Sequence, residues 1–279
     1  MKKHHSYPKK SLGQHFLKDQ KIQLKITSDF IDTADAIIEV GPGAGALTKW
    51  LVVSCEKRGK PFFVIEKDQL LGESLQNLLK KDQIVIGDAL EIDWNEFVKE
   101  KKIDSLNGFS KVWLVSNLPY NISAPLFVNF VKSSSIKYLT LMFQKEVGEK
   151  IVGKKGMNRL KCLSNPFWEV KVLDHVSRNS FWPKPAVDSI VLSLTKRDTE
   201  LLAKSEINDY EFFLKELFKF KRKQLLTVFK SFNYNKFNNC NNIDDVKKIL
   251  DDLQIDYKIR AEDLSMEQII NLYLSVNKL

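Results

Sequence analysis

The chain is poor in residues that build disulfide or metal frameworks, and it lacks a long apolar run. Its 279 residues include three cysteines that are isolated from one another, so we expect neither a disulfide framework nor a zinc site. No uncharged apolar run approaches the ~18 residues that a membrane span needs. The first residues, MKKHHSYPKK, lack the apolar stretch of a secretory signal. We therefore expect a cytoplasmic protein with reduced thiols, no bound metal and no membrane partner.

Glycine and proline are missing from the last third of the chain. All eleven glycines lie at or before Gly156, and all eight prolines lie at or before Pro185. Apolar residues at helical spacing follow Asn242, which is a plausible N-cap, and Ser265 begins a capping-box pattern. The sequence therefore predicts a small all-helical domain over residues 200–279.

Residues 1–199 alternate instead between short apolar runs and amphipathic segments. The runs that read as buried strands cover 36–40, 62–65, 84–86, 112–115 and 138–143. The helical segments between them cover 46–54, 68–80, 93–101 and 122–132. This alternation predicts an α/β domain whose mostly parallel sheet has helices on both faces. Two later runs, 168–176 and 187–195, have little helical pattern between them and fit an antiparallel hairpin at the sheet edge.

The chain has an excess of positive charge, and the excess is clustered. There are 44 Lys and Arg against 35 Asp and Glu, a formal net charge of +9. One cluster lies in residues 1–25 and a second in 145–171. A third, whose spacing predicts one side of a helix, comprises Lys215, Lys219, Arg222 and Lys223. Any one cluster could be a solvated surface, but three together favour a polyanionic partner, most simply nucleic acid.

A glycine-rich turn follows the first predicted strand. Gly41, Gly43 and Gly45 permit positive φ and close backbone approach to a ligand. Their spacing is GxGxG and not the GxGxxG of dinucleotide-binding proteins, which disfavours a nicotinamide dehydrogenase. A tight strand–helix turn without a ligand is the alternative interpretation.

Acidic residues end the next two predicted strands. Glu66 follows the second strand, where a carboxylate can accept hydrogen bonds from both ribose hydroxyls of a nucleoside. Asp88 follows the third strand, where a carboxylate could accept from an adenine amino group. Either residue alone could be a solvated loop acid. Together with the glycine turn at the same sheet edge, they favour a cofactor that contains adenosine.

The residues after the fourth strand suit methylation of an exocyclic adenine nitrogen. That nitrogen is a poor nucleophile because its lone pair is delocalised into the ring. The Asn117 side-chain oxygen and the Leu118 carbonyl could accept its two hydrogens, while Pro119 fixes the backbone. Tyr120 offers a flat face on which the base could stack. A proline-containing turn beside a buried tyrosine is the alternative.

These features together resemble the S-adenosylmethionine-dependent ribosomal RNA adenine dimethyltransferase family, and its small-subunit members in particular. The resemblance covers nearly the whole chain. The matching stretches, in the order of the family, are KSLGQHFL (10–17), EVGPGAGALT (39–48), VIEKD (64–68), GDA (87–89), NLPYNIS (117–123), QKEV (144–147), FWPKPAVDS (181–189) and RAEDLS (260–265).

The resemblance implies a Rossmann-like class I methyltransferase domain with a seven-stranded sheet over residues 1–199, and an RNA-docking helical domain over 200–279. It implies S-adenosylmethionine as cofactor and N6,N6-dimethylation of two adjacent adenines in the 3′-terminal hairpin loop of small-subunit ribosomal RNA. The chain would also inspect immature small subunits, as a monomer. The implied cofactor-binding residues are His15, Leu17, Gly41, Gly43, Glu66, Asp88 and Asn117. Phe181 would join Tyr120 in holding the adenine, and the expected RNA-binding residues are Lys10, Arg159, Lys219, Arg222 and Lys223.

Two departures and two alternatives accompany this interpretation. Asn158 stands where the family commonly has glycine, although Arg159 follows it as expected. The basic stretch near Arg222 is also richer in lysine than is usual, and lysine lacks the bidentate phosphate contact of arginine. A large-subunit RNA methyltransferase of the antibiotic-resistance type shares the Asn117–Tyr120 pattern, and an RNA-binding assembly factor without catalysis is the other alternative.

Overall fold

The computed structural model describes residues 14–103, 111–154, 156–220 and 222–277. The chain forms two compact units. The first comprises the chain up to Gly148 together with Glu169–Lys196, and the second comprises Glu149–Trp168 and the chain from Arg197 onward. Within the described ranges, no helix combines the length and apolar character needed to cross a bilayer.

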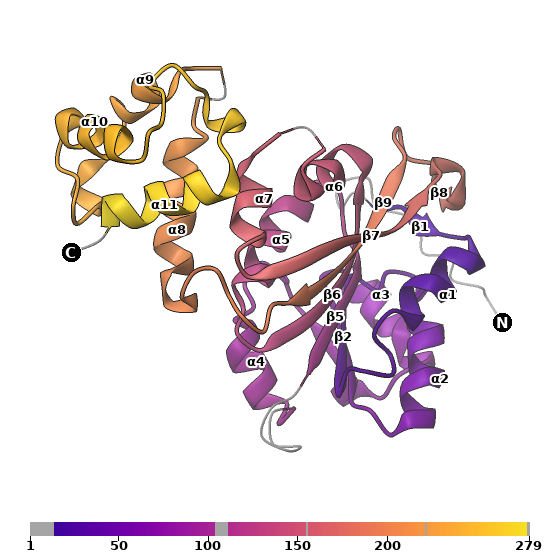
Figure 1. Cartoon of the computed structure of the whole chain (residues 1–279). Helices are drawn as coiled ribbons and strands as arrows, with labels where there is room; N and C mark the ends of the chain where they lie inside the picture. The colour runs from indigo at the N-terminus through magenta and orange to yellow at the C-terminus, as the bar shows by residue number, and fades with distance from the viewer. Residues whose placement is uncertain (1–13, 104–110, 155, 221, 278–279) are drawn as a thin grey trace. The chain divides into compact units, whose positions relative to one another are not determined.

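The first unit is built on a seven-stranded, mostly parallel sheet (Figure 1). Its strands, in spatial order, are β4 (Ile84–Ile86), β3 (Phe62–Glu66), β2 (Ala36–Val40), β5 (Val112–Asn117), β6 (Ile136–Gln144), β9 (Ser189–Lys196) and β7 (Trp168–Val176). The pairs from β4 to β6 are parallel, and β9 runs antiparallel to β6. All seven strands were expected, including the two late ones at the edge of the sheet.

Helices cover both faces of this sheet, as parallel strands require. Figure 1 shows α1 (Gln20–Ser28) and α2 (Thr48–Arg58) on one side and α4 (Trp94–Glu100) and α5 (Ser123–Lys132) on the other. The predicted segment 68–80 forms the short helix α3 (Gln69–Ser74) followed by a 3₁₀ turn. Aspartate side chains cap the first turns of three of these helices: Asp19 caps α1, Asp68 caps α3 and Asp93 caps α4.

The central strands of the sheet are buried on both faces, which explains why they read as continuous apolar runs, whereas the edge strands β4 and β7 are partly exposed. Every residue of β2 is buried, and the Trp113 side chain of β5 is completely enclosed. The Trp113 indole N–H donates to Thr140 Oγ1 at 2.9 Å, so its polar atom is satisfied inside the core. The carboxyl ends of the parallel strands therefore emerge from a rigid layer.

A second, two-stranded sheet was not expected from the sequence. β1 (Phe16–Leu17) pairs antiparallel with β8 (Phe181–Trp182). Two-residue strands show no periodicity, so only the resemblance pointed to these segments. The pairing fixes the start of the described chain beside the main sheet.

The second unit is helical. It contains α7 (Arg159–Ser164), α8 (Ile207–Leu217), α9 (Leu225–Phe229), α10 (Ile243–Asp252) and α11 (Met266–Asn277). Tyr210, Phe213 and Tyr273 pack together in its buried interior. Asn242 caps α10, and the Ser265–Gln268 capping box opens α11 with bonds of 2.8 and 3.0 Å, as predicted.

Two expectations about this unit need correction. The boundary expected at residues 199/200 leaves out residues 149–168, which group with the second unit because α7 packs against α8. The cluster from Lys215 to Lys223 does not share one helix face, because α8 ends at Leu217. Further along, Leu225 is buried and its N–H donates to Ile259 O at 2.8 Å.

The Asn242 cap gives a stability prediction. Its side-chain oxygen accepts from the N–H groups of Asp244 and Asp245, at 2.8 and 3.1 Å. Asn242→Ala should therefore lower the free energy of unfolding by about 1 kcal/mol. Asn241→Ala is the matched control, because only the backbone N–H of Asn241 takes part in a hydrogen bond. Equal urea denaturation midpoints for the two variants would contradict the capping role.

Candidate active site

The glycine turn between β2 and α2 forms one wall of a cavity at the carboxyl edge of the sheet. Gly41 has φ of 66° and Gly43 has φ of 56°, a region that other residues rarely adopt. A Cβ atom on Gly43 would lie 3.1 Å from the Phe16 ring, so a side chain there would also crowd β1. The turn therefore presents bare backbone to the cavity, which suits close approach of a ligand.

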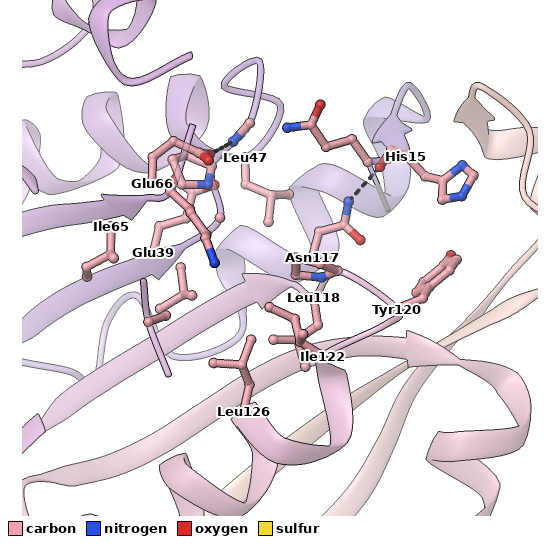
Figure 2. A pocket seen from close by; sticks show the side chains of 18 of the residues that line it. His15, Glu39, Leu47, Ile65, Glu66, Asn117, Leu118, Tyr120, Ile122 and Leu126 are labelled. Carbon is pink, nitrogen blue, oxygen red and sulfur yellow. Dashed lines mark hydrogen bonds between the residues drawn. The ribbon is translucent and has the colours of Figure 1, made fainter. Parts of the chain in front are cut away.

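Glu66, at the end of β3, is tied to the glycine turn. Its Oε2 accepts from the Gly43 N–H at 3.0 Å (Figure 2). Its Oε1 accepts from the Asp68 N–H at 2.9 Å. Burial raises the pKa of the Glu66 carboxyl, and these two bonds oppose the rise. Each of the two carboxylate oxygens keeps a further lone pair, so the Glu66 carboxylate can still accept hydrogen bonds from two neighbouring hydroxyl groups.

Asp88 lies after β4 and has a partner that sequence reasoning missed. Its Oδ2 lies 2.5 Å from Lys67 Nζ, and its Oδ1 accepts from the Leu90 N–H at 3.0 Å. The Lys67 hydrogen bond and the Leu90 bond lower the pKa of Asp88. Lys67 follows Glu66 directly, but no sequence pattern reveals that its side chain reaches the next strand end.

Asn117 ends β5, and its side chain connects this strand to the segment that contains His15. Its side-chain Nδ2 donates to the carbonyl of His15 at 3.0 Å, which leaves Oδ1 as a free acceptor (Figure 2). The adjacent Leu118 is buried, and its N–H donates to Met142 O at 3.3 Å. Among the residues that the structure describes, none donates a hydrogen bond to Asn117 Oδ1 or to the Leu118 carbonyl. The pair of acceptors expected from the sequence is thus present at the cavity.

Tyr120 lies at the mouth of the cavity and is held at both ends. Its hydroxyl is 2.6 Å from Ser189 Oγ, and its ring stacks with the His15 ring at 5.4 Å between centroids. His15 Nδ1 is 2.7 Å from the carbonyl of Pro183, so this nitrogen carries the proton in that bond. Burial raises the pKa of Tyr120, and the tyrosine remains a neutral aromatic platform.

The structure brings together all but one of the predicted cofactor and catalytic residues. The cavity is lined, among others, by His15, Leu17, Gly41, Gly43, Glu66, Asp88, Asn117, Leu118, Pro119 and Tyr120. Phe181 is the exception, because its side chain is only 2% exposed and packs in the core beside Leu17. The antiparallel pairing of β8 with β1 turns Phe181 inward and leaves Trp182 exposed.

The predicted RNA-binding residues lie in the second unit or outside the described residues. Arg159 begins α7, and Lys219 follows α8 closely; both line a separate cavity. Arg222 and Lys223 are exposed in the segment before α9. Lys10 lies outside the described residues.

A buried carboxyl under the glycine turn was not singled out as a site residue. Glu39 of β2 is 2% exposed, and its Oε2 accepts from Thr48 Oγ1 at 2.8 Å. Burial raises the pKa of Glu39 to about 8, and the nearby Glu66 adds to the rise. Glu39 is therefore largely protonated in the folded protein at neutral pH.

This shifted pKa predicts how stability depends on pH. Between pH 4.5 and about 8 the unfolded chain loses the Glu39 proton while the folded chain keeps it, so stability contributed by this group falls as pH rises. Glu39→Gln should remove that fall, which is at most about 1.4 kcal/mol per pH unit. We expect the variant to gain stability relative to the wild type from pH 5 to pH 9 in urea unfolding. Glu56→Gln, at an exposed position of α2, should leave the pH profile unchanged.

Comparison with known proteins agrees with this geometry. The family model described as Ribosomal RNA adenine dimethylase matches residues 6–273 of the chain. The chain is 35% identical over 280 residues to the Ribosomal RNA small subunit methyltransferase A of Lactobacillus johnsonii, covering 95% of this chain and 90% of that protein.

Solved structures show the same fold. A dimethyladenosine transferase from Plasmodium falciparum matches with a TM-score of 0.70 and 24% identity, covering 92% of this chain and 95% of the other. The 23S rRNA methyltransferase ErmE matches with a TM-score of 0.61 and 22% identity, covering 94% and 99%. These two establish the fold alone, whereas the family match extends over nearly the whole sequence. The chain belongs to the ribosomal RNA adenine dimethylase family.

Proposed function

We propose that this protein dimethylates N6 of two adjacent adenines in the 3′-terminal hairpin loop of small-subunit ribosomal RNA, with S-adenosylmethionine as methyl donor. The observation that supports this most directly is the Asn117–Tyr120 segment, whose two free acceptors and aromatic ring lie on the same cavity as the glycine turn and Glu66. An adenosine site beside a pair of acceptors fits the needs of adenine methylation.

The residues of the cavity fit the cofactor. We assign the ribose hydroxyls to Glu66, whose oxygens retain lone pairs, and the adenine amino group to Asp88. Lys67 would have to share Asp88 with that amino group. When bound, S-adenosylmethionine supplies an electrophilic methyl group on its sulfonium. The Gly41 and Gly43 backbone would allow close approach, because neither residue has a side chain that faces the cavity.

Asn117 and Leu118 would activate the target nitrogen. Asn117 Oδ1 and the Leu118 carbonyl accept the two amino hydrogens of adenine, which draws that nitrogen toward tetrahedral geometry and frees its lone pair. The neutral amine needs no base before attack, and its proton can leave afterwards. His15 covers part of one face of the Tyr120 ring, so we assign the target base to the other face.

The substrate and its context are part of the proposal. The resemblance of the segments 10–17 and 260–265 to small-subunit enzymes favours that RNA over the large-subunit RNA. We propose that the immature small subunit is the physical partner, that the protein acts as a monomer, and that it works in the cytoplasm where ribosomes are assembled. RNA would dock through Lys10, Arg159, Lys219, Arg222 and Lys223, whose positive charge suits a phosphate backbone.

The carboxylate role of Glu66 can be tested by calorimetry. Loss of charge-assisted hydrogen bonds of about 1.5–3 kcal/mol should weaken S-adenosylmethionine binding roughly 10- to 150-fold in Glu66→Ala. Glu73→Ala removes the same charge from an exposed position of α3 and should bind normally. Unchanged affinity in a folded Glu66→Ala protein would refute the assignment.

Transfer of methyl groups to undermethylated small subunits tests the function itself. We expect two methyl groups on each of two adjacent adenines, read by mass spectrometry of the 3′-terminal hairpin, and none on large subunits. Tyr120→Ala should slow transfer about 5- to 150-fold, because base stacking is worth about 1–3 kcal/mol. Cofactor affinity should be unchanged.

Tyr120→Phe is the control, since it loses only the hydroxyl bond to Ser189 and keeps the ring. Transfer by Tyr120→Ala at the wild-type rate would reduce Tyr120 to a packing residue. Methylation of large subunits instead of small ones would support the resistance-type alternative. An inactive wild-type protein that still binds RNA would support the assembly-factor alternative.

A further inference from the structure

The helical second unit has a cavity of its own, formed entirely from its own residues. The cavity has a volume of about 500 Å³ and lies where the end of α6 (Lys145–Val152), the start of α7 and the end of α8 approach the 3₁₀ turn Ala261–Asp263. Small-molecule sites in proteins commonly have volumes of about 300–1,000 Å³. The proposed methyl-transfer step uses none of its walls, although two lining residues, Arg159 and Lys219, are among those proposed to dock RNA.

The rim of this cavity is strongly basic. Lys150, Arg159, Lys215 and Lys219 line it, and Glu262 is its one acidic lining residue. Lys215 pairs with Glu211 at 2.8 Å, and Lys219 lies 3.8 Å from Glu216. These pairs neutralise part of the positive charge, so the case for a negative ligand rests on Arg159.

Arg159 is the group in this rim that most needs a partner. It is partly buried, yet among the described residues none forms a hydrogen bond or ion pair with its guanidinium. A guanidinium presents five N–H donors in a planar fork that matches the oxygens of a phosphate. An anion in the cavity would satisfy donors that the protein itself leaves open.

The backbone around Arg159 is held in place. The Asn158 side-chain oxygen caps α7 by accepting from Leu160 N at 3.1 Å and Lys161 N at 3.2 Å. Its amide Nδ2 donates to the carbonyl of Lys150 at 2.8 Å, which joins α6 to α7. The N–H of Met157 donates to Glu262 O at 3.0 Å. Asn158, the departure noted in the sequence, thus fixes the wall that presents Arg159.

Three other residues that line the cavity are apolar and partly exposed. Met157, Leu160 and Phe218 all line it, and none of the three is fully buried. Apolar side chains do not stabilise a bound phosphate. They can stabilise a bound nucleobase, because every base has a π-face that can stack on an aromatic ring. The basic rim and the aromatic lining together match the two halves of a nucleotide.

We propose that this cavity binds one nucleotide unit of a single-stranded RNA segment, with the phosphate at Arg159 and the base against Phe218. The choice of RNA over a free nucleotide rests on the proposed function, whereas the recognition of phosphate and base rests on the cavity alone. Lys150 and Lys219 add charge beside the phosphate, and Asn158 positions Arg159. This site is a second, non-catalytic hold on the substrate.

Binding of a fluorescent six-nucleotide single-stranded RNA to the full chain tests the phosphate half. With the cofactor site saturated by S-adenosylhomocysteine, Arg159→Ala should weaken binding at least about tenfold. It should also reduce the salt dependence by about 0.7 in the slope of log K against log salt. Lys248→Ala, which removes one charge from an exposed position of α10, should change affinity less than twofold. Equal effects of the two variants would overturn the proposal.

The aromatic half is tested by Phe218→Leu, which keeps the apolar bulk and loses the flat face. We expect binding about fivefold weaker, with Phe220→Leu, an exposed neighbour outside the cavity, as the matched control. If Arg159→Ala weakens binding and Phe218→Leu does not, the cavity binds only phosphate and the nucleotide assignment is wrong. Competition by cytidine monophosphate as strong as that by the RNA, at equal concentration, would identify a free-nucleotide site instead.

Cross-linking locates the contact directly. An RNA that contains 4-thiouridine should cross-link on irradiation to peptides carrying Met157–Leu160 or Phe218, and Arg159→Ala should abolish those cross-links. Cross-links confined to peptides carrying Tyr120 would overturn the proposal. All these measurements report binding, so a protein that fails to transfer methyl groups would refute the proposed function without affecting this result.

Discussion

The proposed methyl-transfer site depends on the two ends of one side-chain amide, that of Asn117. Asn117 Nδ2 is committed to the carbonyl of His15, and this bond orients the amide so that Oδ1 remains an open acceptor. The same bond joins β5 to the segment that begins β1, so the acceptor and the wall of the cofactor cavity are positioned together. If the amide were rotated, a donor would face the target amine and repel its hydrogens.

The carboxyl edge of the sheet holds acidic groups whose environments differ. Glu39 is enclosed and keeps its proton near neutral pH, whereas Glu66 is stabilised by two backbone N–H groups and Asp88 by Lys67. Protonation of Glu39 reduces the repulsion that a cluster of charged carboxylates would create under the glycine turn. Glu66 thus faces the cavity with its remaining lone pairs available, which is what recognition of ribose hydroxyls requires.

Much of the fold followed from the sequence because its signals are local. The apolar runs 36–40 and 84–86 are strands with those same bounds, although 84–86 is partly exposed, and the cap at Asn242 is present. The sequence predicted the glycine turn and the Asn117 segment at the same sheet edge, because parallel strands bring their carboxyl ends together. Both segments line one cavity there. The resemblance added His15 and Leu17, which no pattern in the residues would have indicated.

The remaining features depend on tertiary contacts that no local pattern records. The Lys67–Asp88 pair, the two-residue strands β1 and β8 and the inward turn of Phe181 all arise from segments that meet only in the folded chain. Helical spacing grouped Lys215 with Lys223, but α8 ends at Leu217. The assignment of residues 149–168 to the helical unit similarly required the packing of α7 on α8.

The pairing of β1 with β8 has a consequence for the order of events during synthesis. His15 and its hydrogen-bond partner Pro183 are separated by 168 positions along the chain. At a translation rate of about 5–20 residues per second, the early segment waits roughly ten to thirty seconds for its partner. The first strands of the sheet can therefore pair long before β8 and Pro183 are available to hold His15 at the cavity. The cavity can therefore bind a ligand only late in synthesis, after Pro183 has been added to the chain.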